Sequence, residues 1–209
     1  MLKIYGRANS VNVMKVLWVA DEIGLPYERQ DVGGAFGGND QAWYLAMNPN
    51  GVVPTIDDDG FVLWESNTIV RYLAAHHAAG TLWPTDARAR AEAERWMDWQ
   101  LSTIAEGMRI LFWGWVRTPE EKRDYAAMEA ARTATSRLWA RLDAHLATRP
   151  YVAGDRLTVG DVPVGCMAHR WMVLPFRRDD LPELPHLKAW YNRLLGSSAY
   201  ARNVAQPLT

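Results

Sequence analysis

The spacing of hydrophobic residues changes near residue 80, and this change constrains the architecture more than any single motif. Before it, short apolar segments alternate with turns, whereas almost every segment after Leu82-Trp83-Pro84 has the periodicity of a helix. A chain of 209 residues is long enough for one large domain or two small ones, at about 100–200 residues per domain. We therefore expect a small α/β domain at 1–78 and, after a short linker, an all-α domain at 86–209.

The first domain is expected to contain a strand, a helix, a strand, an irregular segment, a hairpin and a second helix. Asp58-Asp59-Gly60 between two apolar segments is a hairpin signal, and the glycines at 33–40 indicate a loop. A βαβ unit followed by an antiparallel hairpin and a helix forms a small mixed sheet flanked by helices. The expected strands lie at 2–5, 27–32, 54–56 and 61–64, and the helices lie at 11–23 and from Ser66 onward.

The second domain contains two helix-start signals. Thr118-Pro119-Glu120-Glu121 combines a capping threonine, a proline at the first helical position and a glutamate that completes a capping box. Thr158-Val159-Gly160-Asp161 is a second capping box, followed by a very apolar segment. Gly107 and Gly114 are possible bends in the long helix before them. The expected helices lie at 86–117, 118–147, 162–174 and, as the last one, 186–195.

Composition excludes several function classes. Lys and Arg number 23 against 24 Asp and Glu, so no excess charge attracts nucleic acid or an anionic membrane. No apolar run approaches the roughly 20 residues of a bilayer span, and the N-terminus leads directly into a strand rather than a signal peptide. The single cysteine, Cys166, excludes an internal disulfide framework and a thiolate zinc cluster, and is expected to be a small buried hydrophobe. We expect a cytoplasmic protein without a metal.

The segment Asn48-Pro49-Asn50-Gly51-Val52-Val53-Pro54 ends with a proline that enters a strand. Proline cannot donate a ladder hydrogen bond, so it must lie at an edge, a strand start or a bulge. A cis Val53–Pro54 bond would leave the backbone N–H and C=O of Val53 free to pair with a peptide ligand. A trans proline in a turn is the alternative, and it is the commoner form.

Glu65-Ser66 follows the hairpin and begins a helix. Ser66 as a simple N-cap is one interpretation. The other is a binding site, because free N–H groups at a helix start attract a carboxylate and Glu65 can hold an ammonium. Together they would grip the α-amino-acid end of a zwitterionic ligand.

These motifs together resemble the cytosolic glutathione transferases. The first 80 residues are similar to that family's thioredoxin-like domain, with Asn48-Pro49-x-Gly51-x-Val53-Pro54, then Glu65-Ser66, then Ile69-Val70-x-Tyr72-Leu73. The Thr158-x-x-Asp161 box matches the capping motif of the family's helical domain. The start Gly-Arg-x-Asn-Ser is similar to bacterial members nearer the phi and theta classes than the tyrosine classes. The resemblance covers essentially the whole chain.

The resemblance implies roles for these residues. Val53–Pro54 becomes the cis peptide that pairs with the cysteinyl backbone of glutathione, and Glu65 and Ser66 become the clamp for its γ-glutamyl end. Val52 stands where phi members have a glutamine, and Gly38-Asn39-Asp40-Gln41 replaces a basic or histidine-containing stretch. Asn39 is the candidate for the glycyl end. These departures bear on affinity for glutathione more than on family.

An enzyme of this family must hold the glutathione thiol as a thiolate. A free thiol has a pKa of about 8.5, and lowering it by about two units requires about 2.7 kcal/mol. A hydrogen bond to a charged group contributes about 1.5–3 kcal/mol, and a helix N-terminus adds about 0.3–1 kcal/mol. One hydroxyl donor at the start of the first helix is therefore sufficient without a metal.

Ser10 lies at that helix start, where phi- and theta-like members place their catalytic serine. A plain N-cap uses the serine oxygen as acceptor and leaves its O–H free to donate, so the two roles are compatible. Tyr5, about where the tyrosine classes carry their phenol, is an alternative donor whose ordinary role is packing. Asn9 and Asn12 are further alternatives, and Asn12 is also an expected glutathione-binding residue.

We expect the electrophile to bind between the domains, against the first long helix. Arg109, Trp113 and Arg117 stand at i, i+4 and i+8 on one face, and Arg7 follows the first strand. Cations beside an indole suit a small anionic or aromatic electrophile, such as a halogenated acid. The alternatives are that Arg117 complements the helix dipole, that Trp113 packs in the core or an interface, and that Arg7 is a solvated loop cation.

The sequence thus predicts a homodimeric glutathione transferase with glutathione as co-substrate. A glutathione-dependent dehalogenase or isomerase on the same site is an alternative. A non-catalytic glutathione-fold module that binds a protein partner is another, although such a module would have a degraded clamp. Asp98 is either a surface charge or a carboxylate lent to the neighbouring subunit's glutathione, and Trp96 and Trp99 are expected between helices or at a dimer seam.

Overall fold

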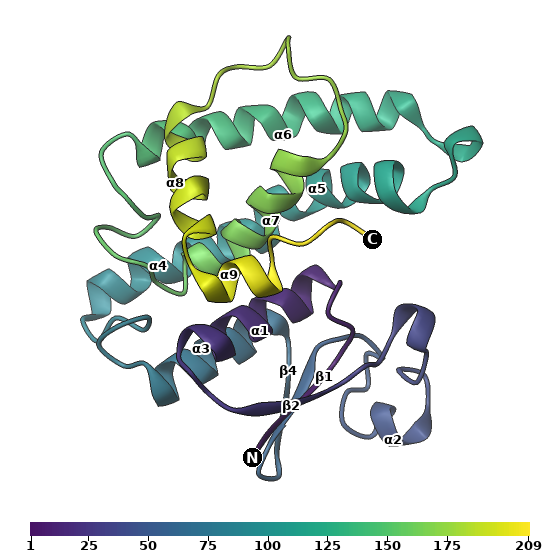
Figure 1. Cartoon of the computed structure of the whole chain (residues 1–209), viewed down its shortest axis with the longest axis vertical. Coiled ribbons are helices and arrows are strands. Elements are labelled where there is room, and N and C mark those ends of the chain that lie inside the picture. The colour runs from purple at the N-terminus through teal and green to yellow at the C-terminus, as the bar shows by residue number, and fades with distance from the viewer.

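The computed structural model describes residues 1–209 and contains a small sheet at one end and a bundle of helices at the other (Figure 1). Helices α1 (Val11–Glu22) and α3 (Ser66–His77) lie between the sheet and the bundle, where α1 packs on α3 and on two helices of the C-terminal half. Helix α1 therefore contacts both halves of the chain.

The sheet has four strands in the order β2-β1-β3-β4. β1 pairs with β2 in parallel, with Leu2 opposite Tyr27, and with β3 antiparallel, with Leu2 opposite Asp58. β3 and β4 form the expected hairpin. The βαβ-ββα prediction is therefore confirmed, with strands β1 (Leu2–Tyr5), β2 (Tyr27–Gln30), β3 (Thr55–Asp58) and β4 (Phe61–Trp64).

Two details of this half differ from expectation. The second strand ends at Gln30 rather than at residue 32. The segment after it contains a single turn of 3₁₀-helix, Gly34–Phe36, and a four-residue helix, α2 (Ala42–Leu45), that the sequence did not indicate. A single helical turn offers too few residues for periodicity to be visible.

The long helix expected at 86–117 is one helical run interrupted by two wide π-turns. Its parts are α4 (Ala87–Trp99), the π-turn Gln100–Ile104, α5 (Ala105–Phe112) and the π-turn Trp113–Arg117. Gly107 lies within α5. A Cβ there would collide with Thr135 of the neighbouring helix, so this glycine serves close helix packing. Gly114 lies in the second π-turn and is also closely packed, against Met128.

The next helix begins later than the Thr118 signal predicted. α6 (Tyr125–Leu146) is capped by Asp124, whose side chain accepts from the Ala127 N–H at 2.9 Å. Pro119 instead precedes a 3₁₀ turn, Glu120–Lys122. Arg123 has extended backbone angles, so that turn does not continue as a helix. The predicted start at residue 118 was therefore wrong by about two helical turns.

The remaining helices are α7 (Asp161–Val173), α8 (Pro185–Leu195) and α9 (Ser198–Asn203). α7 and α8 match the expected segments, whereas α9 was missed and α8 is not the last helix. α9 packs on α1, with Tyr200 edge-on to Trp18 at 4.7 Å between ring centroids. Ser197 caps α9.

One hydrophobic core extends through both halves of the chain. Cys166 is buried in it, as predicted. Trp96 packs against Trp99, and Trp99 against Trp139, so these side chains lie between helices. None of the helices combines the length and hydrophobicity that a membrane crossing requires.

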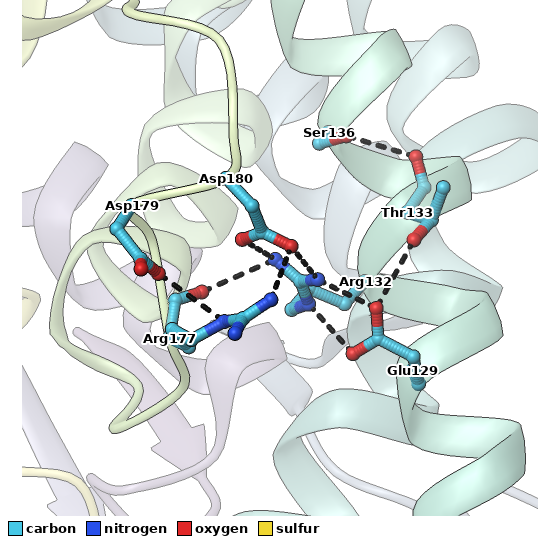
Figure 2. A network of polar contacts seen from close by, with 7 residues as sticks. All are labelled: Glu129, Arg132, Thr133, Ser136, Arg177, Asp179 and Asp180. Carbon is cyan, nitrogen blue, oxygen red and sulfur yellow. Dashed lines mark hydrogen bonds and ion pairs between the residues drawn. The ribbon is translucent and has the colours of Figure 1, made fainter.

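The loop between α7 and α8 is held to α6 by an ion-pair network (Figure 2). The guanidinium of Arg132 donates to both carboxylate oxygens of Asp180, at 2.8 and 2.7 Å, and to the carboxylate of Glu129. Arg177 adds contacts to Asp179 and Asp180. The paired charges raise the pKa of Arg132 and lower that of Asp180.

Candidate active site

A cleft of about 620 Å³ opens where the two halves meet. Its walls are the loop after β1, the first turn of α1, the segment at Gly34–Phe36 and the helical run that contains both π-turns. Two polar side chains that were not predicted, Gln100 and Arg170, also line it. The predicted residues that the structure brings together here are Arg7, Asn9, Ser10, Asn12, Arg109, Trp113 and Arg117.

Ser10 occupies the N-cap position of α1 with extended backbone angles. Its carbonyl accepts from the Met14 N–H at 2.9 Å, which begins the helix. Its hydroxyl makes no capping bond. The O–H therefore stays available to donate to a ligand atom at the positive end of the helix dipole.

The loop that contains Val53 is held by hydrogen bonds from two side chains, Tyr44 and Asn48. The carbonyl of Val52 accepts from the Tyr44 hydroxyl at 2.7 Å and from the Asn48 side-chain amide at 2.8 Å. The Val53–Pro54 bond is cis. The N–H and C=O of Val53 make no hydrogen bond within the chain, so both are free to pair with an extended peptide.

Ser66 is not the N-cap of its helix, contrary to one interpretation of the sequence. Glu65 takes that position with φ of 73°, a left-handed conformation that is uncommon for a non-glycine residue. Ser66 is the first helical residue, and its hydroxyl donates to the Asn12 side-chain oxygen at 3.3 Å. The Glu65 carboxylate is exposed and has no ion-pair partner. Glu65-Ser66 thus places a free carboxylate beside the N-terminus of α3.

A buried lysine connects this helix start to the cleft. Lys15 of α1 is fully buried, and its ammonium donates to Ser66 at 3.3 Å, Asn67 at 3.0 Å and Gln100 at 2.9 Å. Burial lowers its pKa to about 8. Three acceptors satisfy its three N–H bonds. Lys15 therefore holds the start of α3 against the first π-turn of the helical half.

Three arginines reach the cleft without an acidic partner. The guanidinium carbon of Arg170, in α7, lies over the Phe112 ring, 3.7 Å from its centroid. Arg7 donates to the side chain of Asn9 at 2.6 Å, and Arg117 is exposed at the end of the second π-turn. Burial lowers the pKa of Arg170 to about 10, and the charges of Arg7 and Arg117 add to this effect. The three positive charges thus share one region.

The other predicted residues differ in position. Arg109 lines the cleft but pairs with Glu106, and Trp113 is 56 % exposed at the rim. Tyr5 packs against Trp43, with 6.0 Å between ring centroids. Neither Tyr5 nor Asn39 lines the cleft, and the Asn39 amide donates to the carbonyl of Gly51 at 2.7 Å. Asp98 pairs with Arg71.

Comparison with known proteins matches the chain to two family models. Residues 9–76 match "Glutathione S-transferase, N-terminal domain" and residues 125–193 match "Glutathione S-transferase, C-terminal domain". The chain is 41% identical to the Escherichia coli protein "Glutathione S-transferase GstB", over 100% of both chains. The chain belongs to the glutathione S-transferase family.

Other relatives agree with this assignment. Glutathione S-transferase 3 of Zea mays is 32% identical over 98% of this chain and 93% of its own. A crystal structure described as a theta class glutathione S-transferase from Xanthomonas axonopodis pv. citri, with glutathione bound, is 53% identical. It has a TM-score of 0.95 and is matched over 99% of its length and 100% of this chain. The predicted family and the thioredoxin-like plus all-helical fold are therefore confirmed.

Proposed function

We propose that this member of the family is an active glutathione transferase whose cleft joins the glutathione thiolate to a small electrophile. The observation that supports this most directly is the free hydroxyl of Ser10 at the start of α1, facing a cleft between the two halves. The thiolate sulfur would accept from this hydroxyl. The positive end of the α1 dipole favours the charged form of the sulfur.

The tripeptide would lie along the carboxyl edge of the sheet, within a glutathione-binding domain at 1–78. Its γ-glutamyl ammonium would meet the free carboxylate of Glu65, and its γ-glutamyl carboxylate would meet Ser66 and the start of α3. The unpaired N–H and C=O of Val53 suit its cysteinyl backbone. We retain Asn39 for the glycyl end, and the domain at 86–209 carries the electrophile.

The competing proposal is a non-catalytic module of the same fold that binds glutathione but does not conjugate it. The two are separated by binding and turnover measured on the same preparation. We expect the purified chain to be retained on immobilised glutathione and to conjugate glutathione to chlorodinitrobenzene above the uncatalysed rate. Glu65→Gln, which removes the partner of the ammonium, is expected to raise the KM for glutathione at least about tenfold. Retention without turnover would favour the binding module.

We further propose that the protein is a homodimer. β4 is an edge strand, and its side chains Phe61, Val62 and Trp64 are exposed. An exposed apolar edge of this kind is typical of an interface between chains. Sedimentation velocity at micromolar concentration is expected to show a dimer, and a monomer throughout would contradict it.

A reducing compartment suits the single thiol of Cys166, and we propose a cytoplasmic location.

A further inference from the structure

The positive charge of the cleft is not matched by acidic groups of the chain. Four arginines line the cleft, and none of the lining residues is aspartate or glutamate. Only Arg109 has a carboxylate partner, Glu106. The remaining arginines, Arg7, Arg117 and Arg170, make no ion pair anywhere in the chain.

Arg170 is the most informative of the three. It is only 7 % exposed, and its Nε–H is buried without a hydrogen-bond partner. A buried charge without a partner is costly, and folded proteins rarely keep one without a role. Arg132, another buried arginine of this chain, shows the ordinary solution, because it faces two carboxylates (Figure 2).

Arg7 shows the same feature. Its Nε–H is also buried and unpartnered, and its single side-chain bond goes to the neutral Asn9. Burial lowers the pKa of Arg7, and the charge of Arg117 lowers it further. Three guanidiniums held together without an anion leave the cleft ready for one. A glutathione thiolate at Ser10 supplies a single negative charge to this region, which leaves positive charge unmatched.

We propose that Arg7, Arg117 and Arg170 form a subsite for the carboxylate or sulfonate of an anionic electrophile, an inference that rests on the proposed transferase function. Arg guanidinium groups bind such oxyanions with paired, charge-assisted hydrogen bonds. The Phe112 ring supports Arg170, whose Cζ lies 3.7 Å from the ring centroid. The electrophilic carbon would then lie between this anchor and the sulfur at Ser10.

The test compares two electrophiles that differ in charge. Chloronitrobenzoate, with chlorine para to the carboxylate and ortho to the nitro group, is paired with the chloronitrobenzamide of the same pattern. In both reactions the thiolate sulfur bonds to the ring carbon that carries chlorine, and chloride leaves with the C–Cl electron pair. Dividing each kcat/KM by the uncatalysed rate constant removes the intrinsic difference between the two rings.

We expect the corrected kcat/KM of the wild-type protein to favour the benzoate at least about tenfold. Arg117→Gln, at an exposed position, is expected to reduce that preference about tenfold by raising the KM for the benzoate. Arg170→Met is expected to reduce it further. Turnover of the benzamide and the KM for glutathione should change less than about threefold. Arg90→Gln is the matched control, because Arg90 also lies over an aromatic ring, that of Trp83, but outside the cleft.

The outcomes separate this inference from the proposed function. Turnover of the benzamide with no preference for the benzoate would overturn the anion subsite and leave the transferase intact. Equal loss of both substrates in Arg117→Gln, or a rise in the KM for glutathione alone, would also overturn it, because the arginines would then serve the tripeptide. If the wild-type protein conjugates none of the electrophiles above the uncatalysed rate, the proposed transferase function itself is contradicted.

Discussion

Replacing Ser10 with alanine is expected to lower kcat for conjugation about 100-fold. The hydroxyl lies at the start of α1, and the helix does not use it as a cap. Loss of a donor to a developing or resident anion costs about 10²–10³ in rate at comparable sites. The measurement is steady-state turnover of chlorodinitrobenzene at saturating glutathione.

Ser197→Ala is the matched control for this substitution. Ser197 is also a serine at a helix start, but its oxygen accepts from the Tyr200 N–H and it lies outside the cleft. We expect this variant to lose stability, about 1 kcal/mol for a helix cap, and to keep its turnover. A full rate in Ser10→Ala, with loss in Tyr5→Phe or Asn9→Ala, would show that the donor assignment is wrong.

Replacing Asp161 with asparagine is expected to destabilise the fold by about 3–4 kcal/mol. Asp161 is fully buried, and its carboxylate accepts from the N–H groups of Val152 and Thr158 at 3.0 and 2.9 Å. It also accepts from the Thr158 hydroxyl and the indole N–H of Trp190. An asparagine amide would direct its own N–H groups at these donors and leave buried groups unsatisfied.

Chemical denaturation, followed by tryptophan fluorescence, measures this effect. A domain is typically stable by only about 5–15 kcal/mol, so the loss should shift the transition midpoint strongly. Asp155→Asn is the control, because Asp155 is exposed in the preceding loop. A midpoint for Asp161→Asn within error of that control would contradict the proposal that this carboxylate stabilises the fold by its hydrogen bonds to Val152, Thr158 and Trp190.

The elements with strong local signals were the predictable ones. β1, α1 and the β3–β4 hairpin carry an apolar periodicity or a turn signal and lie close to the expected positions. α2 and α9 are too short for such a signal. The start of α6 was misplaced because Thr118-Pro119 satisfies a local capping rule, whereas the backbone at Arg123 interrupts the helix.

The candidate site was predictable where its residues form a linear motif. Ser10, Val53–Pro54 and Glu65-Ser66 lie within short segments whose spacing carries the family resemblance. Lys15 and Arg170 were missed because each lies within an apolar stretch of its helix, and the groups that they contact come from distant parts of the chain. A basic residue within an otherwise buried run was the signal, since burying a charge is costly.

The pKa of the thiol of bound glutathione tests the central claim most directly. Ultraviolet absorbance of the thiolate, titrated against pH in the complex, is expected to give a midpoint about two units below the 8.5 or so of a free thiol. In Ser10→Ala the pKa of the bound thiol should rise most of the way back to the value of a free thiol, while glutathione occupancy stays unchanged. A bound thiol that titrates like free glutathione in the wild-type protein would contradict the account.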